Sequence, residues 1–159
     1  MGVSGSGKST LGALLAERIG FSFVDGDELH PIANKRKMVR GVPLDDDDRA
    51  PWLDAIAAAL KQKDVVIACS ALKRSYRDRL RSGLTELYFI YLSGTREILH
   101  QRLISRAHEF MPPALLDSQL ATLQPPGFDE GALTIDIAAP IETIIRRAFD
   151  WLNEEESPR

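Results

Sequence analysis

The sequence predicts a single α/β domain in which a parallel sheet is flanked by helices. Two observations lead to this prediction. Segments with an apolar residue every three or four positions alternate with short, continuous apolar runs, as expected of helices and buried parallel strands. The chain has 159 residues, of which 44% are hydrophobic and 27% charged, and this suits one domain with one substantial core. No repeat or linker interrupts it, so we treat residues 1–159 as one domain.

The first half of the chain contains three predicted helices and two predicted strands. A helix over residues 8–19 ends at Gly20, and a short strand follows at residues 21–25. The next helix, over residues 30–39, is ended by Gly41 and Pro43. Asp47 or Asp48 can cap a third helix that has Pro51 in its first turn and runs to residue 60. Residues 65–69 are continuously apolar, which is typical of a strand covered on both faces.

The second half repeats the same alternation. A helix is predicted over residues 73–81 and a strand over residues 87–92. Thr95 opens the next helix, and Pro112 and Pro113 lead into another that continues to residue 123. Residues 133–137 form the last predicted strand and residues 141–152 the last helix. Strands that alternate with helices in this way predict a doubly wound parallel sheet.

Composition argues against several classes of function. The net charge of −3 gives no global attraction to nucleic acid or to an anionic membrane. No apolar run approaches the roughly 18 residues that span a bilayer, and no secretory signal is visible, so we expect a cytoplasmic protein. The single cysteine, Cys69, ends a predicted strand and is expected to be an inert core thiol.

The strongest motif lies at the N-terminus and matches the phosphate-loop pattern Gly-x4-Gly-Lys-Ser/Thr. Glycines let consecutive backbone N–H groups converge on phosphate oxygens, and the helix that follows aims its N-terminus at the same anion. Lys8 should reach the β- and γ-phosphates of a nucleotide, and the Ser9 hydroxyl should bind Mg²⁺. The predicted nucleotide-binding residues are Gly2, Val3, Ser4, Gly5, Ser6, Gly7, Lys8, Ser9 and Thr10.

One expected neighbour of this loop is missing from the sequence. A phosphate loop normally follows a buried strand, yet only Met1 precedes Gly2. Such a strand would bury apolar surface worth roughly 8–15 kcal/mol, which is comparable to the net stability of a domain. We therefore predict a gap in the middle of the sheet, and Met1 is expected to be a misassigned start or a truncation point.

Further motifs follow the loop in register, and together they resemble the gluconate kinases, small P-loop kinases related to shikimate and adenylate kinases. The resemblance covers nearly the whole chain, and its long middle block is highly specific. The matching blocks are residues 1–9, Asp25-Gly26-Asp27, His30-Pro31-x-x-Asn34-x-x-Lys37-Met38, Gly41-x-Pro43-Leu44-x-Asp46-x-Asp48-Arg49-x-Pro51-Trp52-Leu53, Cys69-Ser70-Ala71-Leu72-Lys73-x-x-Tyr76-Arg77-Asp78 and Phe110-Met111-Pro112.

The resemblance implies transfer of a phosphoryl group from ATP to the terminal hydroxyl of D-gluconate, with Mg²⁺, giving 6-phospho-D-gluconate and ADP. Asp25 and Asp27 stand two apart at a strand end, so both leave the carboxyl edge of the sheet, where open α/β folds bind ligands. By analogy with related kinases, Asp25 holds Mg²⁺ through water and Asp27 accepts or orients the proton of the attacking hydroxyl. The bland alternative is that either aspartate only caps the next helix.

Gluconate is a carboxylate with several hydroxyls, so its pocket needs a cation and hydrogen-bonding groups. The candidate cations are Arg49, Lys73 and Arg77, and His30 is a candidate partner of the hydroxyls. Each has a structural alternative. Arg49 could pair with the acidic run at residues 45–48, Lys73 and Arg77 could be solvated helix charges, and His30 could make a structural hydrogen bond.

A lid is expected around residues 105–123, and Arg102 and Arg106 lie four apart as the chain enters it. In related kinases such arginines cover the adenine and contact the transferring phosphate. By this analogy Arg102 is predicted to bind the nucleotide. The predicted catalytic residues are Lys8, Asp27 and Arg106. The chain departs from the family in carrying His108-Glu109 where Gly-His is usual, and Gln124 where the family has Glu. Analogy also suggests a homodimer. The rival functions are another small-molecule kinase, such as one for shikimate, and a non-catalytic nucleotide binder.

Overall fold

Four parallel strands form the centre of the computed structural model, which describes residues 1–105 and 113–156. β1 (Ser22–Asp25) pairs with β2 (Val65–Ala68), and β3 (Phe89–Ser93) pairs with β4 (Ala132–Asp136). The register places Ser22 opposite Val65 and Phe89 opposite Ala132. Helices occupy the connections between paired strands, as parallel pairing requires. The predicted fold class, a parallel sheet flanked by helices, is therefore confirmed.

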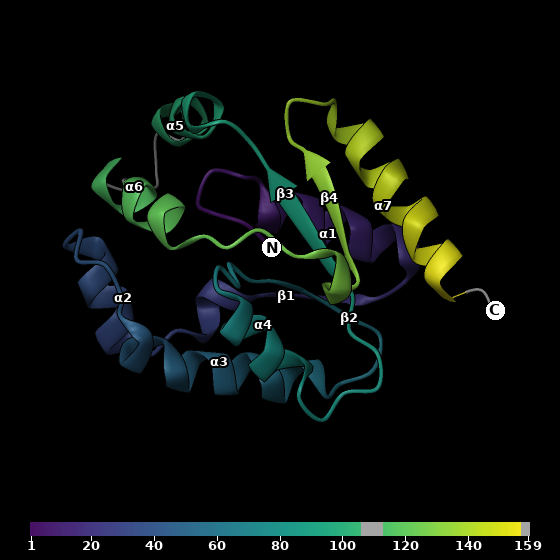
Figure 1. Cartoon of the computed structure of the whole chain (residues 1–159), viewed down its shortest axis with the longest axis horizontal. Helices are drawn as coiled ribbons and strands as arrows, with labels where there is room; N and C mark the ends of the chain where they lie inside the picture. The colour runs from purple at the N-terminus through teal and green to yellow at the C-terminus, as the bar shows by residue number, and fades with distance from the viewer. Residues whose placement is uncertain (106–112, 157–159) are drawn as a thin grey trace.

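The two strand pairs are bridged by backbone hydrogen bonds of Met1 and Gly2 rather than by a strand. The Met1 amine donates to the Ile90 carbonyl, and the Leu92 N–H donates to the Met1 carbonyl at 2.9 Å. On the other side, the Gly2 N–H donates to the Ser70 carbonyl at 3.2 Å, just beyond β2. No strand precedes the phosphate loop within residues 1–105, so the predicted gap between β2 and β3 is confirmed (Figure 1).

Helices lie on both sides of these strands (Figure 1). α1 follows the phosphate loop and contacts β1, β2 and α7, while α3 packs against α4. Two short 3₁₀ helices, η1 and η2, precede α2 and β4. The bounds are α1 Lys8–Ile19, η1 Gly26–Leu29, α2 Ile32–Val39, α3 Asp46–Leu60, α4 Arg74–Arg81, α5 Arg96–Ser105, α6 Pro113–Thr122, η2 Phe128–Glu130 and α7 Ile141–Glu156.

Most element boundaries follow from local chemistry, and two differences from the sequence prediction have a clear local cause. Gly20 ends α1 with a φ of 77°, as expected of a left-handed C-terminal residue. α3 is capped by Asp45, whose carboxylate accepts the Asp48 N–H at 2.8 Å, so the prediction of Asp47 or Asp48 as the cap was wrong. α2 begins at Ile32 rather than at residue 30, because His30 still ends η1 and Pro31 precedes the first turn.

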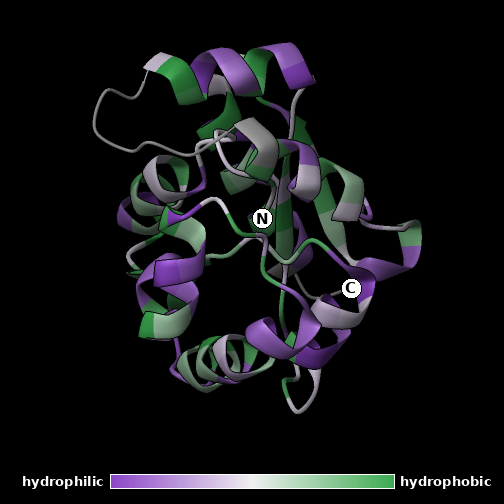
Figure 2. Ribbon diagram, turned by 90° about the vertical axis from the view of Figure 1, so that its left-hand side faces the viewer, coloured by the Kyte–Doolittle hydropathy of each residue, from purple (hydrophilic) through white to green (hydrophobic). Residues whose placement is uncertain are grey.

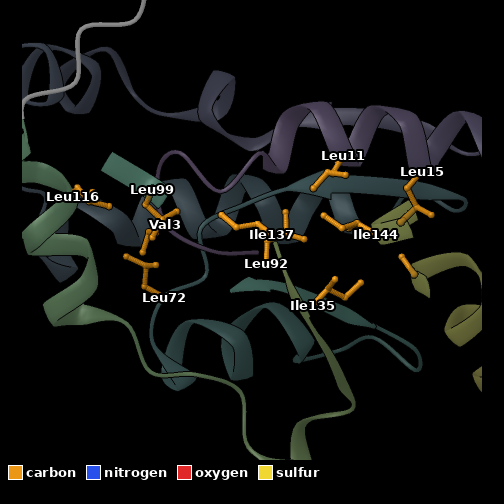
Figure 3. Close-up of a cluster of buried hydrophobic side chains, with 11 residues drawn as sticks. Val3, Leu11, Leu15, Leu72, Leu92, Leu99, Leu116, Ile135, Ile137 and Ile144 are labelled. Atoms are coloured by element: carbon orange, nitrogen blue, oxygen red, sulfur yellow. The ribbon is translucent and has the colours of Figure 1, made fainter. Parts of the chain in front are cut away.

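Two clusters of buried apolar side chains hold the layers together. The larger one joins α1, β3, β4 and α7 and extends to Leu99 of α5 and Leu116 of α6, and Figure 3 shows its side chains lying among these elements. The smaller one joins α3 and α4 and includes Trp52 of α3, which is fully buried. Figure 2 shows that hydrophobic residues concentrate on the central strands, whereas hydrophilic residues lie mainly on the surrounding helices. Among the described residues, no helix is long and apolar enough to cross a membrane.

Candidate active site

The phosphate loop is open at the N-terminus of α1. Gly7 is the N-cap residue and makes no side-chain cap, so the first N–H groups of α1 stay available to an anion. Gly5 has a φ of 81°, and a Cβ there would lie 2.8 Å from the Leu99 carbonyl oxygen. Only glycine fits this position. The side chains of Val3 and Ser6 are buried, so these residues can contribute only their backbone to the loop.

Two cationic side chains lie beside the loop. Lys8 Nζ donates to the Val3 carbonyl at 3.0 Å, so the ammonium group curls back over the loop. Arg102 Nη2 donates to the Ile137 carbonyl at 2.7 Å, and its Nη1 lies 3.6 Å from where a Cβ of Gly7 would be. Ser9 and Thr10 follow in the first turn of α1. The described part of the predicted nucleotide site is therefore assembled in one place.

Asp25 and Asp27 leave the carboxyl end of β1, as their spacing predicted. Asp25 Oδ1 accepts the Asp27 N–H at 3.0 Å and so caps η1. This bond uses one of the two carboxylate oxygens of Asp25. Gly26, between them, is pressed against β2, because a Cβ there would lie 2.4 Å from the Ala68 carbonyl oxygen. The close contact fixes where the two aspartates leave the sheet.

A cavity of about 50 Å³ joins the loop to the predicted acceptor residues. Its lining includes Ser4 and Lys8 of the phosphate loop together with Asp27, His30 and Arg49. A larger hollow of about 450 Å³ adjoins it and contains Lys73 and the acidic residues 45–47 but no residue of the loop. Arg49 and Leu44 line both. Chemistry on a nucleotide phosphate thus fits only the smaller cavity.

The two predicted cations at the hollow have protein partners in this structure. Arg49 donates from Nη1 to the Leu44 carbonyl, and its guanidinium carbon lies 5.9 Å from the centre of the Tyr76 ring. Lys73 Nζ contacts both carboxylate oxygens of Asp46, at 2.7 and 2.8 Å, and the Tyr76 hydroxyl donates to the same carboxylate. The hydrogen bond from Lys73 contributes most to lowering the pKa of the Asp46 carboxyl, and the one from Tyr76 contributes next. A carboxylate already sits in the cation site.

Of the three predicted cations, Arg77 is the one that lines neither hollow. Its side chain has no exposed surface and forms a two-bond ion pair with Glu130, at 2.5 and 2.9 Å. Its remaining donors reach the Ala71 and Leu72 carbonyls at 3.0 and 3.3 Å. The predicted contact of Arg77 with substrate is not supported, because its donors are committed to buried acceptors.

His30 is packed as a neutral ring at the edge of the cavity. It stacks on Trp52 with ring centres 4.3 Å apart and an interplanar angle of 8°. Its Nδ1 lies 3.4 Å from Asn34 Nδ2. Burial, with the charges of Arg49 and Lys35 adding to it, lowers the pKa of His30 to about 4. At neutral pH this ring carries no charge, and it can donate a hydrogen bond to a hydroxyl or accept one from it.

The lowered pKa of His30 predicts a specific pH dependence of stability. Because the unfolded ring binds a proton near pH 6.5 and the folded ring only near pH 4, acid favours the unfolded chain in that window. The free energy of unfolding should fall by about 2 kcal/mol more in the wild type than in His30→Gln between pH 7 and pH 5. Urea unfolding at both pH values measures this difference. Equal changes in the two proteins would contradict the buried neutral ring.

Two glutamines contribute contacts that sequence reasoning did not find. Gln119 of α6 accepts the Ser4 N–H through its Oε1 at 2.7 Å and lines the small cavity. Gln124 accepts the Arg74 N–H at 2.8 Å, and so binds the start of α4, which has no cap of its own. Nothing in a helical pattern distinguishes Gln119 from a solvated helix residue. The predicted Arg106 and the residues His108-Glu109 lie outside the described residues.

Neither thiol chemistry nor a preformed metal cluster competes with this site. Burial raises the pKa of Cys69 to about 12, so its thiol stays protonated, as expected of an inert core residue. Within residues 1–105 and 113–156, no three side chains of the His, Cys, Asp and Glu types gather as a metal site. The arrangement instead combines an anion-binding loop with a carboxylate and cations across a small cavity, which suits phosphoryl transfer to a polar acceptor.

Comparison with known proteins agrees with this chemistry. The family model described as shikimate kinase matches residues 4–124. The thermoresistant gluconokinase of Escherichia coli K12 is 46% identical over 160 residues, covering 97% of this chain and 91% of that protein. A probable gluconokinase of Xenopus tropicalis is 42% identical, covering 91% and 87% of the two chains. The crystal structure of a gluconokinase from Sinorhizobium meliloti 1021 superposes with a TM-score of 0.90 at 48% identity, covering 97% of this chain and 89% of that one.

Proposed function

The chain belongs to the gluconokinase family of small P-loop kinases, and we propose that it transfers the γ-phosphoryl group of ATP to D-gluconate, giving 6-phospho-D-gluconate and ADP. One observation carries the proposal on the structural side. Lys8 of the phosphate loop and Asp27, His30 and Arg49 line a single cavity. A phosphoryl group held by the loop therefore faces groups able to hold a polyhydroxy acid.

The nucleotide side of the reaction rests on the loop backbone and Lys8. The open N–H groups at the start of α1 would bind the phosphates, and the Lys8 ammonium would move from the Val3 carbonyl to their oxygens. Ser9 and Asp25 fit a magnesium ion, because Asp25 keeps one carboxylate oxygen outside its capping bond and Mg²⁺ takes few protein ligands beside phosphate and water. When bound, magnesium neutralises charge on the phosphates.

On the acceptor side, Asp27 would take the proton of the terminal hydroxyl. As the new oxygen–phosphorus bond forms, the bond between the γ-phosphorus and the bridging oxygen breaks, ADP leaves with that electron pair, and Asp27 holds the proton of the hydroxyl. No covalent enzyme intermediate is needed. Asp27, in η1 just after β1, lines the same cavity as the loop residues Ser4 and Lys8, which supports this role.

The rest of gluconate must extend beyond the small cavity. A space of about 50 Å³ holds only a few water molecules, whereas the adjoining hollow of about 450 Å³ can hold the chain of an acid sugar. We place the substrate carboxylate there, near Arg49 and Lys73. It would compete with the Asp46 carboxylate for the Lys73 ammonium. Selection of an acidic substrate follows from this exchange.

The proposal predicts turnover that depends on gluconate. In a coupled ADP-release assay with magnesium, wild-type protein should release ADP with gluconate at least about 100-fold faster than with shikimate or AMP, as expected where a polar site is built for one acceptor. A faster rate with shikimate or AMP would identify another small-molecule kinase. Normal ATP binding without stimulation by any acceptor would identify a non-catalytic nucleotide binder.

Two broader expectations accompany the proposal. We place the activity in the cytoplasm, where ATP and magnesium are supplied. The homodimer expected by analogy stays a prediction, and light scattering of the purified protein would test it. The expected lid around residues 105–123 remains part of the proposal, in which Arg102 and Arg106 would close over the phosphates.

A further inference from the structure

Gln119 makes a contact that the phosphoryl-transfer scheme above does not use. The residue lies in α6, and its Oε1 accepts the Ser4 N–H at 2.7 Å across 115 positions of sequence. Because a backbone N–H can only donate, this bond fixes the carboxamide with its oxygen toward the loop. The Nε2 group must then point away from Ser4. The loop therefore sets the orientation of the side chain.

The Nε2 group is available at the small cavity. Gln119 lines that cavity together with Lys8 and Asp27, and no hydrogen bond from its Nε2 is found to the described residues. A carboxamide nitrogen carries two donors. The cavity lining thus combines a side chain that can offer a neutral donor with the residue that would hold the phosphates and the residue that would activate the acceptor.

A transferring phosphoryl group has to cross this cavity. Its three peripheral oxygens carry negative charge throughout the transfer, and fixed donors aimed at them lower the barrier without reorganisation. We propose that Gln119 is a catalytic residue that donates from Nε2 to the transferring phosphoryl group while its Oε1 stays on Ser4. The inference rests on the proposed phosphoryl transfer and assigns it a further donor.

Two substitutions separate this role from that of a structural brace. Gln119→Glu can still accept the Ser4 N–H, but it replaces the donor with a negative charge. Gln119→Ala removes both groups. If Nε2 serves the phosphoryl group, kcat should fall by about 100-fold in Gln119→Ala and at least as much in Gln119→Glu, with KM for ATP within about threefold. If Gln119 only braces the loop, Gln119→Ala should weaken nucleotide binding and raise KM for ATP by more than about threefold, which would overturn the inference.

A binding experiment tests the same inference without an acceptor. ADP with aluminium fluoride and magnesium mimics the transferring phosphoryl group, and titration calorimetry gives its affinity beside that of ADP alone. Both variants should bind ADP like the wild type but bind the aluminium fluoride complex at least about tenfold more weakly. Unchanged affinity for that complex would overturn the role of Gln119. Gln101→Ala, an exposed glutamine of α5, is the matched control and should change neither affinity.

The outcomes keep this inference distinct from the proposed function. A wild type that ignores gluconate, while the Gln119 variants lose the aluminium fluoride complex, would overturn the acceptor and support Gln119. If the wild type turns over gluconate and the variants equal it in both experiments, the proposed acceptor is supported and the role of Gln119 is overturned. Thermal melting of each variant confirms that it is folded before either comparison is made.

Discussion

Replacing Lys8 with alanine should lower kcat/KM for ATP by at least about 10³-fold and leave the fold intact. The Lys8 ammonium is the cation that the phosphate-loop motif assigns to the phosphates. In this structure it contacts the Val3 carbonyl at 3.0 Å. Because that bond stays within the loop, the side chain is held beside the phosphate position before the nucleotide arrives. The loss of a positive charge in a water-poor site then weakens the transition state more than the ground state.

The control for this change is another lysine on the surface. Lys63→Ala, in the exposed turn before β2, removes the same charge far from the loop and should leave kcat/KM within about twofold of the wild type, as surface substitutions do. The melting temperature of Lys8→Ala should stay within about 2 °C of the wild type, since the hydrogen bond to the Val3 carbonyl contributes little net stability. Steady-state rates at several ATP concentrations measure the effect. Activity of Lys8→Ala within tenfold of the wild type would rule out the phosphate role of Lys8.

The elements and the phosphate loop could be predicted because their signals are local in sequence. α1 begins at Lys8 and ends at Ile19, as the apolar spacing and Gly20 indicated. The strand ends shifted by one or two residues, because their pairing partners set the last ladder bonds.

The parts of the site that sequence reasoning missed depend on contacts between distant residues. Arg77 was a candidate cation for the substrate carboxylate, but the carboxylate of Glu130, 53 positions away, binds its guanidinium instead. Gln119 went unnoticed because its partner Ser4 lies 115 positions away. Residue type and spacing give the chemistry that a side chain can do, whereas the partner that it finds depends on how the chain folds back.

The buried Arg77–Glu130 pair carries the largest expected effect on stability. Both side chains are almost fully buried, and Glu130 also accepts the Gly127 N–H at 2.8 Å. Arg77→Met would leave an uncompensated carboxylate in the interior, which costs about 3–5 kcal/mol in comparable buried pairs. This is a large share of the roughly 5–15 kcal/mol that stabilises a domain. Urea unfolding should therefore show a midpoint far below that of the wild type.

Two further variants isolate the pair itself. Arg77→Met with Glu130→Leu removes both charges and should recover part of the loss, but not all, because the Ala71 and Leu72 carbonyls still lose their donor. Arg79→Met breaks the exposed pair with Asp54 and should cost less than about 1 kcal/mol. A single Arg77→Met variant as stable as Arg79→Met would show that the buried pair contributes nothing.

The same pair links stability to the acceptor side of the site. Ala71 is fully buried with a φ of 44°, a conformation that costs energy for a residue with a side chain, and Arg77 holds its carbonyl in place. The neighbouring Ser70 and Leu72 line the small cavity, and the Ser70 carbonyl accepts the Gly2 N–H at the base of the phosphate loop. The bond to Arg77 lowers the pKa of Glu130, so the stability from this pair is present above about pH 4.5 and is lost as acid protonates the folded carboxyl.

Loss of the Arg77 bond to the Ala71 carbonyl should also affect the kinetics. At a temperature where Arg77→Met is still folded, KM for gluconate should rise more than KM for ATP. The segment around Ala71 on the acceptor side loses the bond that fixes it, whereas α1 keeps its contacts.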